Sequence, residues 1–317
     1  MRKIKVLVLL SGGLDSILAA KILMEQGIRV VGLTFKSYFF GADFAKKAAK
    51  ELKIPLKIID FSKEHLEIVK KPKYNYGKGM NPCIDCHILM LKKAKYILEK
   101  GKFDFAATGE VLGERPMSQN PKALKLVEKA SSLTGYLLRP LSAKLLEKTI
   151  PEEKSWIDRE KLFNISGRSR KRQITLAKKW RIKEYPTPAG GCLLCDLEFS
   201  KRLRELFERY PKFKGQDIEL LKVGRHFWFS KSLKDKQNKV KIVVGRKHTE
   251  NLKLKKLAKR GDILIELKEL SGPTTLVRNY GRGKISYEIL EQAKAKTKHY
   301  STKARKKKEV KFNVIKI

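Results

Sequence analysis

Residues 5–16 read Lys5-Val6-Leu7-Val8-Leu9-Leu10-Ser11-Gly12-Gly13-Leu14-Asp15-Ser16. The aliphatic run before Ser11 is typical of a buried parallel strand, and helical spacing of apolar residues follows over 17–23. A strand, a glycine turn and a helix N-terminus together bind phosphate, because glycines let the backbone approach and free N–H groups face the anion. No Gly-Lys-Ser/Thr follows, so this is not a Walker A loop. The alternative is an ordinary turn with a Ser/Asp cap.

Strand and helix patterns alternate after this turn. Strand-like runs lie at 29–35, 56–60, 103–108 and 136–138, and helical patterns lie at 42–52 and 87–100. The alternation predicts an α/β domain on a doubly wound parallel sheet, with its ligand at the carboxyl ends of the strands. After about residue 210, short strand-like runs predict a smaller α+β domain. We therefore predict domains at 1–207 and 208–317.

The charge balance points to a polyanionic partner. The 317 residues contain 73 Lys plus Arg against 33 Asp plus Glu, a formal net charge of +40. Thermophile surfaces are also rich in lysine, but they carry matching glutamate, which is absent here. Nucleic acid is therefore the favoured partner. The basic stretch 294–308 is predicted to be a mobile or RNA-ordered tail. No apolar stretch is long enough to span a membrane, so we expect a cytoplasmic protein with no membrane partner.

All four cysteines lie in two CxxC pairs, Cys83/Cys86 and Cys192/Cys195. A structural disulfide is not expected in a reducing cytosol. Three interpretations stay open from the spacing alone. Four thiolates suit a tetrahedral Zn²⁺ site, and a pair before a helix suits a redox dithiol. Cysteine thiolates are also the standard ligands of iron–sulfur clusters.

Five motifs together resemble the PP-loop tRNA thiouridine synthetases, especially relatives of the 4-thiouridine synthetase without its N-terminal RNA-binding module. They are SGGLDS (11–16), NPCIDC (81–86), TGEVLGERPMSQ (108–119), LLRPL (137–141) and PAGGCLLC (188–195). Residues 220–280 resemble the RNA-binding domain of NFACT proteins, through Val223-Gly224-Arg225-His226, Val244-Gly245-Arg246 and Gly272-Pro273-Thr274. The resemblance implies a PP-loop, adenine nucleotide alpha hydrolase-like fold.

The resemblance also implies a reaction, in which ATP activates a uridine carbonyl oxygen of tRNA and sulfur replaces it. Oxide is a poor leaving group, whereas the adenylated oxygen departs as AMP after pyrophosphate is released. By analogy, the nucleotide would be bound by Ser11, Gly12, Gly13, Asp15, Ser16, Thr34, Thr108 and Gly109. Asp15 would orient the loop or hold Mg²⁺. Glu110 either caps a helix or lies near the nucleotide.

The sulfur chemistry implied by the resemblance takes one of two forms. Two cysteines can relay a persulfide, or three can hold a 4Fe–4S cluster whose open iron binds sulfide. Cys83, Cys86 and Cys192 match the three-cysteine pattern, with Cys83 and Cys192 as the catalytic pair. Cys195 departs from that pattern, because it can close the cluster or serve as a spare nucleophile. Sulfide or a cysteine desulfurase product would supply the sulfur, and a homodimer stays open.

RNA contacts are predicted from basic residues. The catalytic half offers Arg168, Arg170, Lys171 and Arg172, and the second domain offers Arg225 and Arg246. A solvated loop is the alternative for the first group. His226 either contacts RNA or packs, and 227–229 is interpreted as core. Competing functions are a PP-loop enzyme acting on a small molecule or another tRNA base, and a non-thiolating RNA-binding ATPase.

Overall fold

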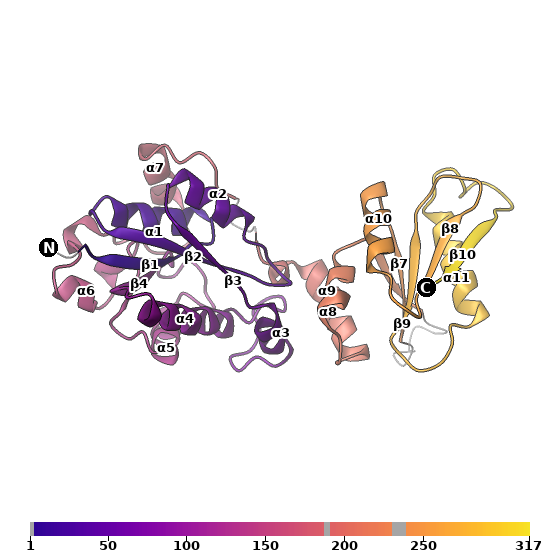
Figure 1. Cartoon of the computed structure of the whole chain (residues 1–317), viewed down its shortest axis with the longest axis horizontal. Helices are drawn as coiled ribbons and strands as arrows, with labels where there is room; N and C mark the ends of the chain where they lie inside the picture. Colours follow the sequence, from indigo (N-terminus) through magenta and orange to yellow (C-terminus); the bar gives the residue numbers. More distant parts are fainter. Residues whose placement is uncertain (1–2, 187–190, 230–238) are drawn as a thin grey trace. The chain divides into compact units, whose positions relative to one another are not determined.

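The computed structural model describes residues 3–186, 191–229 and 239–317. The chain divides into two compact units, Met1–Cys195 and Asp196–Ile317 (Figure 1). The boundary expected at 207 falls inside helix α8 (Leu197–Arg209), which begins just after this division. The predicted boundary was based on the change in sequence character near residue 210. Helix α8 lies before that point, but it buries one apolar face and belongs as a whole to the second unit.

The first unit is built on five parallel strands in the order β3-β2-β1-β4-β5. They are β1 (Lys5–Leu9), β2 (Arg29–Lys36), β3 (Leu56–Asp60), β4 (Phe105–Thr108) and β5 (Leu137–Leu138). The chain adds β2 and β3 on one side of β1 and then β4 and β5 on the other. The prediction of a doubly wound parallel sheet is therefore confirmed. The winding reverses between β1 and β4, which is where such sheets bind ligands.

Helices cover both faces of this sheet (Figure 1). One face carries α1 (Leu14–Met24), α2 (Asp43–Glu51) and α7 (Lys171–Lys179), and the other carries α3 (Ser62–Lys70), α4 (Cys83–Lys100) and α5 (Pro121–Ala130). The short helix α6 (Ile150–Glu153) follows β5. In β1, Val6 and Val8 pack into the α1 side, whereas Leu7 packs into the α4 side. Because both faces are apolar, the strand is aliphatic throughout.

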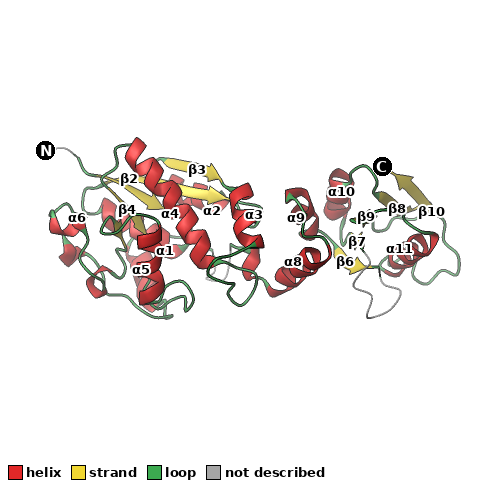
Figure 2. Cartoon of the chain, turned by 90° about the horizontal axis from the view of Figure 1, so that it is seen from below, coloured by secondary structure: helices red, strands yellow, loops and turns green. Residues whose placement is uncertain are grey.

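The second unit contains a five-stranded antiparallel sheet in the order β10-β8-β9-β7-β6. Its strands are β6 (Arg225–Trp228), β7 (Val240–Val244), β8 (Ile263–Leu267), β9 (Thr275–Asn279) and β10 (Phe312–Lys316). Helix α11 (Tyr287–His299) packs on one face, and α9 (Gly215–Leu221) and α10 (His248–Leu257) pack on the other, as Figure 2 shows for α10 and α11. The predicted smaller α+β domain is confirmed.

The basic stretch 294–308 does not form a separate tail, so that prediction is wrong. Its first residues complete α11, and the chain then turns back to add β10 beside β8. Ala293, Thr297 and Ala304 are fully buried there. Lysines occupy the positions between these buried residues. Because the lysines are so numerous, the helical spacing of the buried residues is hard to recognise in the sequence. Across the described ranges, no helix is long and apolar enough to cross a bilayer.

Candidate nucleotide and sulfur site

Two serine hydroxyls hold the turn between β1 and α1. Ser11 Oγ accepts a hydrogen bond from the Gly13 N–H at 3.2 Å and lies 3.2 Å from Ser16 Oγ. Ser16 Oγ donates to the Gly13 carbonyl at 2.8 Å. Gly12 has φ of +82°, and a Cβ there would lie 2.3 Å from the Phe44 carbonyl carbon. Position 12 therefore accepts only glycine, and both serines stabilise the shape of the loop.

A cavity of about 480 Å³ opens over this loop at the ends of β1, β2 and β4. Seven of the eight predicted nucleotide-binding residues line it, namely Ser11, Gly13, Asp15, Ser16, Thr34, Thr108 and Gly109. Gly12 lies beneath them in the same turn. The fold thus brings together residues that are more than 90 positions apart in the chain. Their role in binding ATP stays a prediction.

Asp15 is the carboxylate nearest to the centre of this loop. Burial raises its pKa, and the positive charges of Arg170 and Arg115 act in the opposite direction. Among the described residues, its Oδ1 is buried without a hydrogen-bond partner. Burial and the charge of Asp15 also raise the pKa of Glu114, which lines the cavity. Mg²⁺ takes oxygen ligands of this kind, so Asp15 fits the predicted magnesium role.

A buried network beside the loop was not predicted from the sequence. Glu110 accepts hydrogen bonds from Thr108 Oγ1 at 3.0 Å and Arg139 Nε at 3.1 Å, and its second oxygen lies 2.9 Å from His87 Nδ1. Arg139 also pairs with Glu128 at 2.9 Å. Glu110 therefore makes buried ion pairs at the cavity wall, and the alternative of a helix cap is wrong. The motif Thr108-Gly109-Glu110 indicated that Glu110 follows a strand. No neighbouring residue in the sequence indicated that His87 and Arg139 would contact it.

The charges of this network shift two pKa values. Burial acts to raise the pKa of Glu110, but Arg139 and His87 outweigh it and hold that pKa at about 2. Burial likewise acts to lower the pKa of His87, and Glu110 outweighs it, so the pKa of His87 is raised. His87 and Glu110 both line the cavity, which therefore has a charged wall opposite the glycine loop.

The two cysteine segments lie against each other. Helix α4 begins at Cys83, so the first CxxC pair occupies its first turn and not the preceding loop. The Met80 N–H donates to the Leu194 carbonyl at 3.1 Å, and this bond joins the two segments. The Leu193 N–H donates to the Phe39 carbonyl at 3.0 Å. Residues 187–190, which include most of the predicted PAGG loop, lie outside the described residues.

The four thiols differ in their surroundings. Cys192 lines the cavity over the glycine loop, whereas Cys195 is exposed. Cys86 is buried in the apolar core of the α4 side, where burial raises its pKa. A hydrogen bond with Cys195, together with burial, raises the pKa of Cys83. Cys83 Sγ also accepts a hydrogen bond from Asn81 Nδ2 at 3.2 Å.

These positions bear on the predicted metal site. Over the described ranges, no three His, Cys, Asp or Glu side chains stand close enough together to hold a metal ion. Cys195, and not Cys192, is the hydrogen-bonded neighbour of Cys83. A 4Fe–4S cluster on Cys83, Cys86 and Cys192 therefore stays a prediction, as does a zinc site that includes Cys195.

The predicted RNA-binding residues fall into two environments. Arg168, Lys171 and Arg172 are exposed, but Arg170 is half-buried and acts on Asp15. In the second unit, the guanidinium of Arg225 lies 4.5 Å from the ring centroid of Tyr300. Arg246 is exposed and donates to the Gly224 carbonyl at 2.9 Å. Contact with RNA stays a prediction for all of them.

The aromatic residues of β6 are half-buried, as predicted. The ring centroid of Phe227 lies 5.9 Å from that of Tyr300, and Trp228 lies 5.9 Å from Tyr280. His226 is half-buried with both ring nitrogens enclosed, and burial holds its pKa well below the usual value. A neutral, enclosed histidine fits the packing interpretation and not a phosphate contact.

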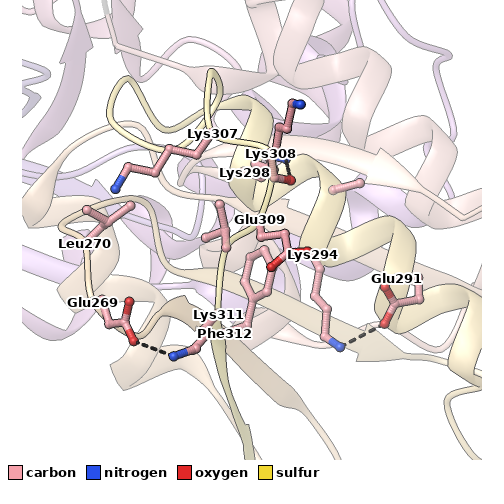
Figure 3. A pocket seen from close by; sticks show the side chains of 12 residues that line it. Glu269, Leu270, Glu291, Lys294, Lys298, Lys307, Lys308, Glu309, Lys311 and Phe312 are labelled. Atoms are coloured by element: carbon pink, nitrogen blue, oxygen red, sulfur yellow. Dashed lines mark hydrogen bonds and ion pairs between the residues drawn. The ribbon is translucent and has the colours of Figure 1, made fainter.

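A groove of about 730 Å³ lies in the second unit between α11 and the segment before β10 (Figure 3). Five lysines line it, namely Lys294, Lys298, Lys307, Lys308 and Lys311. Lys294 pairs with Glu291 at 2.8 Å, and Lys311 pairs with Glu269 at 3.2 Å. Lys298 Nζ donates to the Lys308 carbonyl at 3.0 Å. Part of the predicted basic tail thus forms a wall of this groove.

The fold and the glycine loop define an α/β domain built on a doubly wound parallel sheet, followed by a separate antiparallel domain. Residues 4–155 match the family described as tRNA methyl transferase HUP domain. Residues 224–316 match the family described as NFACT protein RNA binding domain. The predicted resemblance to PP-loop tRNA thiouridine synthetases with an NFACT-type domain is confirmed by these matches and by the relatives below.

The chain is similar to several curated tRNA-thiolating proteins. It is 28% identical over 264 residues to the tRNA-specific 2-thiouridylase MnmA of Karelsulcia muelleri, a match that covers 77% of this chain and 66% of the relative. It is 30% identical over 248 residues to that of Metamycoplasma arthritidis, covering 68% and 62%. A probable tRNA sulfurtransferase of Finegoldia magna is 34% identical over 141 residues, covering 43% and 35%. The chain thus spans less than two thirds of the length of these relatives.

Among solved structures, a 4-thiouridine synthetase bound to RNA and ATP has a similar segment. It is 23% identical and covers 43% of this chain and 36% of that chain, with a TM-score of 0.36.

Proposed function

We propose that this chain is an ATP-dependent, AMP-forming tRNA sulfurtransferase that replaces a uridine carbonyl oxygen by sulfur. One observation carries the proposal. A single cavity is lined by the Ser11–Ser16 loop and by Cys192, so a nucleotide-binding loop and a thiol face the same space. The activities for which the curated relatives are named support this assignment.

The reaction we propose has two displacements. The uridine oxygen attacks the α-phosphorus of ATP, and pyrophosphate leaves. A sulfur nucleophile then adds to the uracil carbon that bears the adenylated oxygen, and that oxygen departs as part of AMP. The N–H groups in the first turn of α1 would hold the phosphates, and the helix dipole of α1 would favour their charge. Asp15 would hold Mg²⁺, which neutralises the departing pyrophosphate.

Cys192 is the residue that we propose to present sulfur, because it is the only cysteine among the described lining residues of the cavity. In one route it carries a persulfide, whose outer sulfur bonds to the uridine carbon as AMP leaves. The thiol of Cys83, its predicted catalytic partner, then attacks Cys192 Sγ, so that the S–S bond to the base breaks and a Cys83–Cys192 disulfide forms. A thiol reductant restores the two cysteines.

In the other route, Cys83, Cys86 and Cys192 hold a 4Fe–4S cluster, which when bound supplies an iron site for sulfide. The thiol donors suit a cluster, but Cys86 lies in an apolar core and Cys195 lies beside Cys83. We therefore derive no step through a cluster.

The partner that we propose is tRNA, with the sulfur supplied as sulfide or by a cysteine desulfurase product. The net charge of +40 and the NFACT-type match of residues 224–316 support an RNA partner. A homodimer on one tRNA stays a proposal.

The deciding experiment is mass spectrometry of tRNA nucleosides from cells with and without the gene. We expect one thiouridine to disappear on deletion and to return with the wild-type gene but not with Cys192→Ser. An unchanged thionucleoside profile would overturn the proposal. The cluster is tested separately by counting iron and sulfide after anaerobic reconstitution, and zinc in place of iron would exclude it.

A further inference from the structure

Three side chains beside the glycine loop have buried polar atoms without a hydrogen-bond partner of normal geometry. Among the described residues, Asp15 Oδ1, Arg170 Nε and both amide atoms of Gln173 make no hydrogen bond of normal geometry. Gln173 is 0% exposed. Buried polar atoms are almost always paired, because an atom that loses water without gaining a new partner destabilises the fold. Several such atoms in one place indicate a ligand that completes the site.

These side chains meet because α7 packs against α1. Ala177 of α7 joins the same apolar core as Leu14 and Ile17 of α1. The start of α7 lies near the start of α1, since Arg170 and Gln173 both act on Asp15. Arg170 is the charge that acts most strongly on Asp15, and Gln173 also interacts with that carboxylate. The sequence separates Asp15 from these partners by more than 150 residues.

The charges around Asp15 favour a polyphosphate. Arg115 and Arg170 act on both Asp15 and Glu114, so two cations face two carboxylates at the cavity. The cavity itself is lined by Asp15, Glu114 and Arg115. A guanidinium presents several fixed donors that match phosphate oxygens, and a buried one without a hydrogen bond at Nε is ready to donate.

We propose that Arg170 and Gln173 belong to the nucleotide site, with Arg170 contacting the phosphates of ATP and Gln173 positioning Asp15. The basic cluster 168–172 is then divided by function. Arg170 faces the loop, whereas Arg168, Lys171 and Arg172 are exposed and free to meet tRNA. This inference rests on the proposed function only in taking ATP as the ligand.

The first test measures the affinity of the full chain for a non-hydrolysable ATP analogue with Mg²⁺, and separately for tRNA. We expect Arg170→Met to weaken analogue binding by about tenfold to a hundredfold, the effect of one charge-assisted hydrogen bond, and to leave tRNA affinity within about twofold. Arg170→Lys should recover part of the loss. The matched control is Arg168→Met, which should leave analogue binding unchanged. Lost tRNA affinity with unchanged analogue binding in Arg170→Met would overturn the inference.

The second test addresses Gln173 through Gln173→Leu, which keeps the buried volume and removes the polar atoms. We expect thermal stability to hold or rise while AMP-forming turnover falls by about tenfold, with KM for ATP little changed. Full turnover would show that Gln173 only packs.

The outcomes separate this inference from the proposed function. If the wild type binds the ATP analogue but tRNA nucleosides are unchanged on deletion, the proposed thiolation fails and the assignment of Arg170 stands. If the wild type does not bind the analogue, both fail.

Discussion

Gly109 lies so close to Asp15 that a Cβ at position 109 would stand 2.5 Å from the Asp15 carbonyl carbon. It would also stand 2.5 Å from the Ser16 amide nitrogen. Gly109 follows β4, and Asp15 lies in the first turn of α1, which follows β1. The contact therefore joins the two strand ends between which the winding of the sheet reverses. Glycine at 109 is required by this close backbone approach.

Gly109→Ala should separate these strand ends. We expect a loss of about 1–3 kcal/mol in the free energy of unfolding, as for other overpacked sites, together with weaker binding of an ATP analogue. The control for stability is Gly41→Ala, because a Cβ there would meet only Asp43 Oδ2, at 3.8 Å. Urea denaturation measures the free energy of unfolding of both variants, and equilibrium binding measures the analogue affinity of Gly109→Ala. Equal free energies of unfolding for the two variants would contradict the close contact.

Glu110→Gln should be strongly destabilising. Glu110 is nearly fully buried between Arg139 and His87, and removing its charge leaves the buried Arg139 short of a partner. Breaking a buried pair costs about 3–5 kcal/mol. Glu147→Gln is the matched control, since the pair of Glu147 with Lys125 is exposed and surface pairs contribute about 0–1 kcal/mol. A similar midpoint of urea denaturation for both variants would contradict the network.

The four thiols should react with an alkylating agent in an order set by burial. In the reduced, metal-free protein we expect Cys195 to react first, because it is exposed, and Cys86 last, because it is buried and its pKa is raised. Timed iodoacetamide labelling with peptide mass spectrometry gives the four rates. Fast labelling of Cys86 would show that the start of α4 opens in solution.

Lys241 should make the stability of the second unit depend on pH. This residue of β7 is 0% exposed, its Nζ lies 4.2 Å from the ring centroid of Trp228, and burial lowers its pKa to about 7. Between that value and the ordinary lysine pKa, the unfolded chain binds a proton that the folded chain does not. The free energy of unfolding therefore rises with pH across this window.

Lys241→Met should flatten this rise and stabilise the protein at pH 7, where the wild type bears the cost of a buried charge. Thermal unfolding of the full chain at pH 7 and at pH 9.5 compares the two. The exposed Lys253→Met serves as the control and should keep the wild-type slope. An unchanged slope in Lys241→Met would show that another group carries the pH dependence.

Much of the site was predictable where its signals are local. The glycine loop, the strand ends at Thr34 and Thr108, and the CxxC pairs were all recognised from short patterns, and the cavity brings the loop and strand ends together with Cys192. The partners of Glu110 were not predictable, since His87 and Arg139 reach it from α4 and from the chain after β5. No pattern within one segment carries that information.

The sequence by itself determined the two domains, the parallel sheet and the phosphate-type loop. Each follows from short-range physical preferences. Aliphatic runs form buried strands, glycines allow tight turns, and the helical connections between parallel strands are right-handed. Only the tertiary structure decided that Arg170 faces Asp15, that Cys195 neighbours Cys83 and that the lysine-rich stretch completes α11 and leads into β10. These contacts depend on how elements that are distant in the chain pack together, and no local sequence pattern predicts that packing.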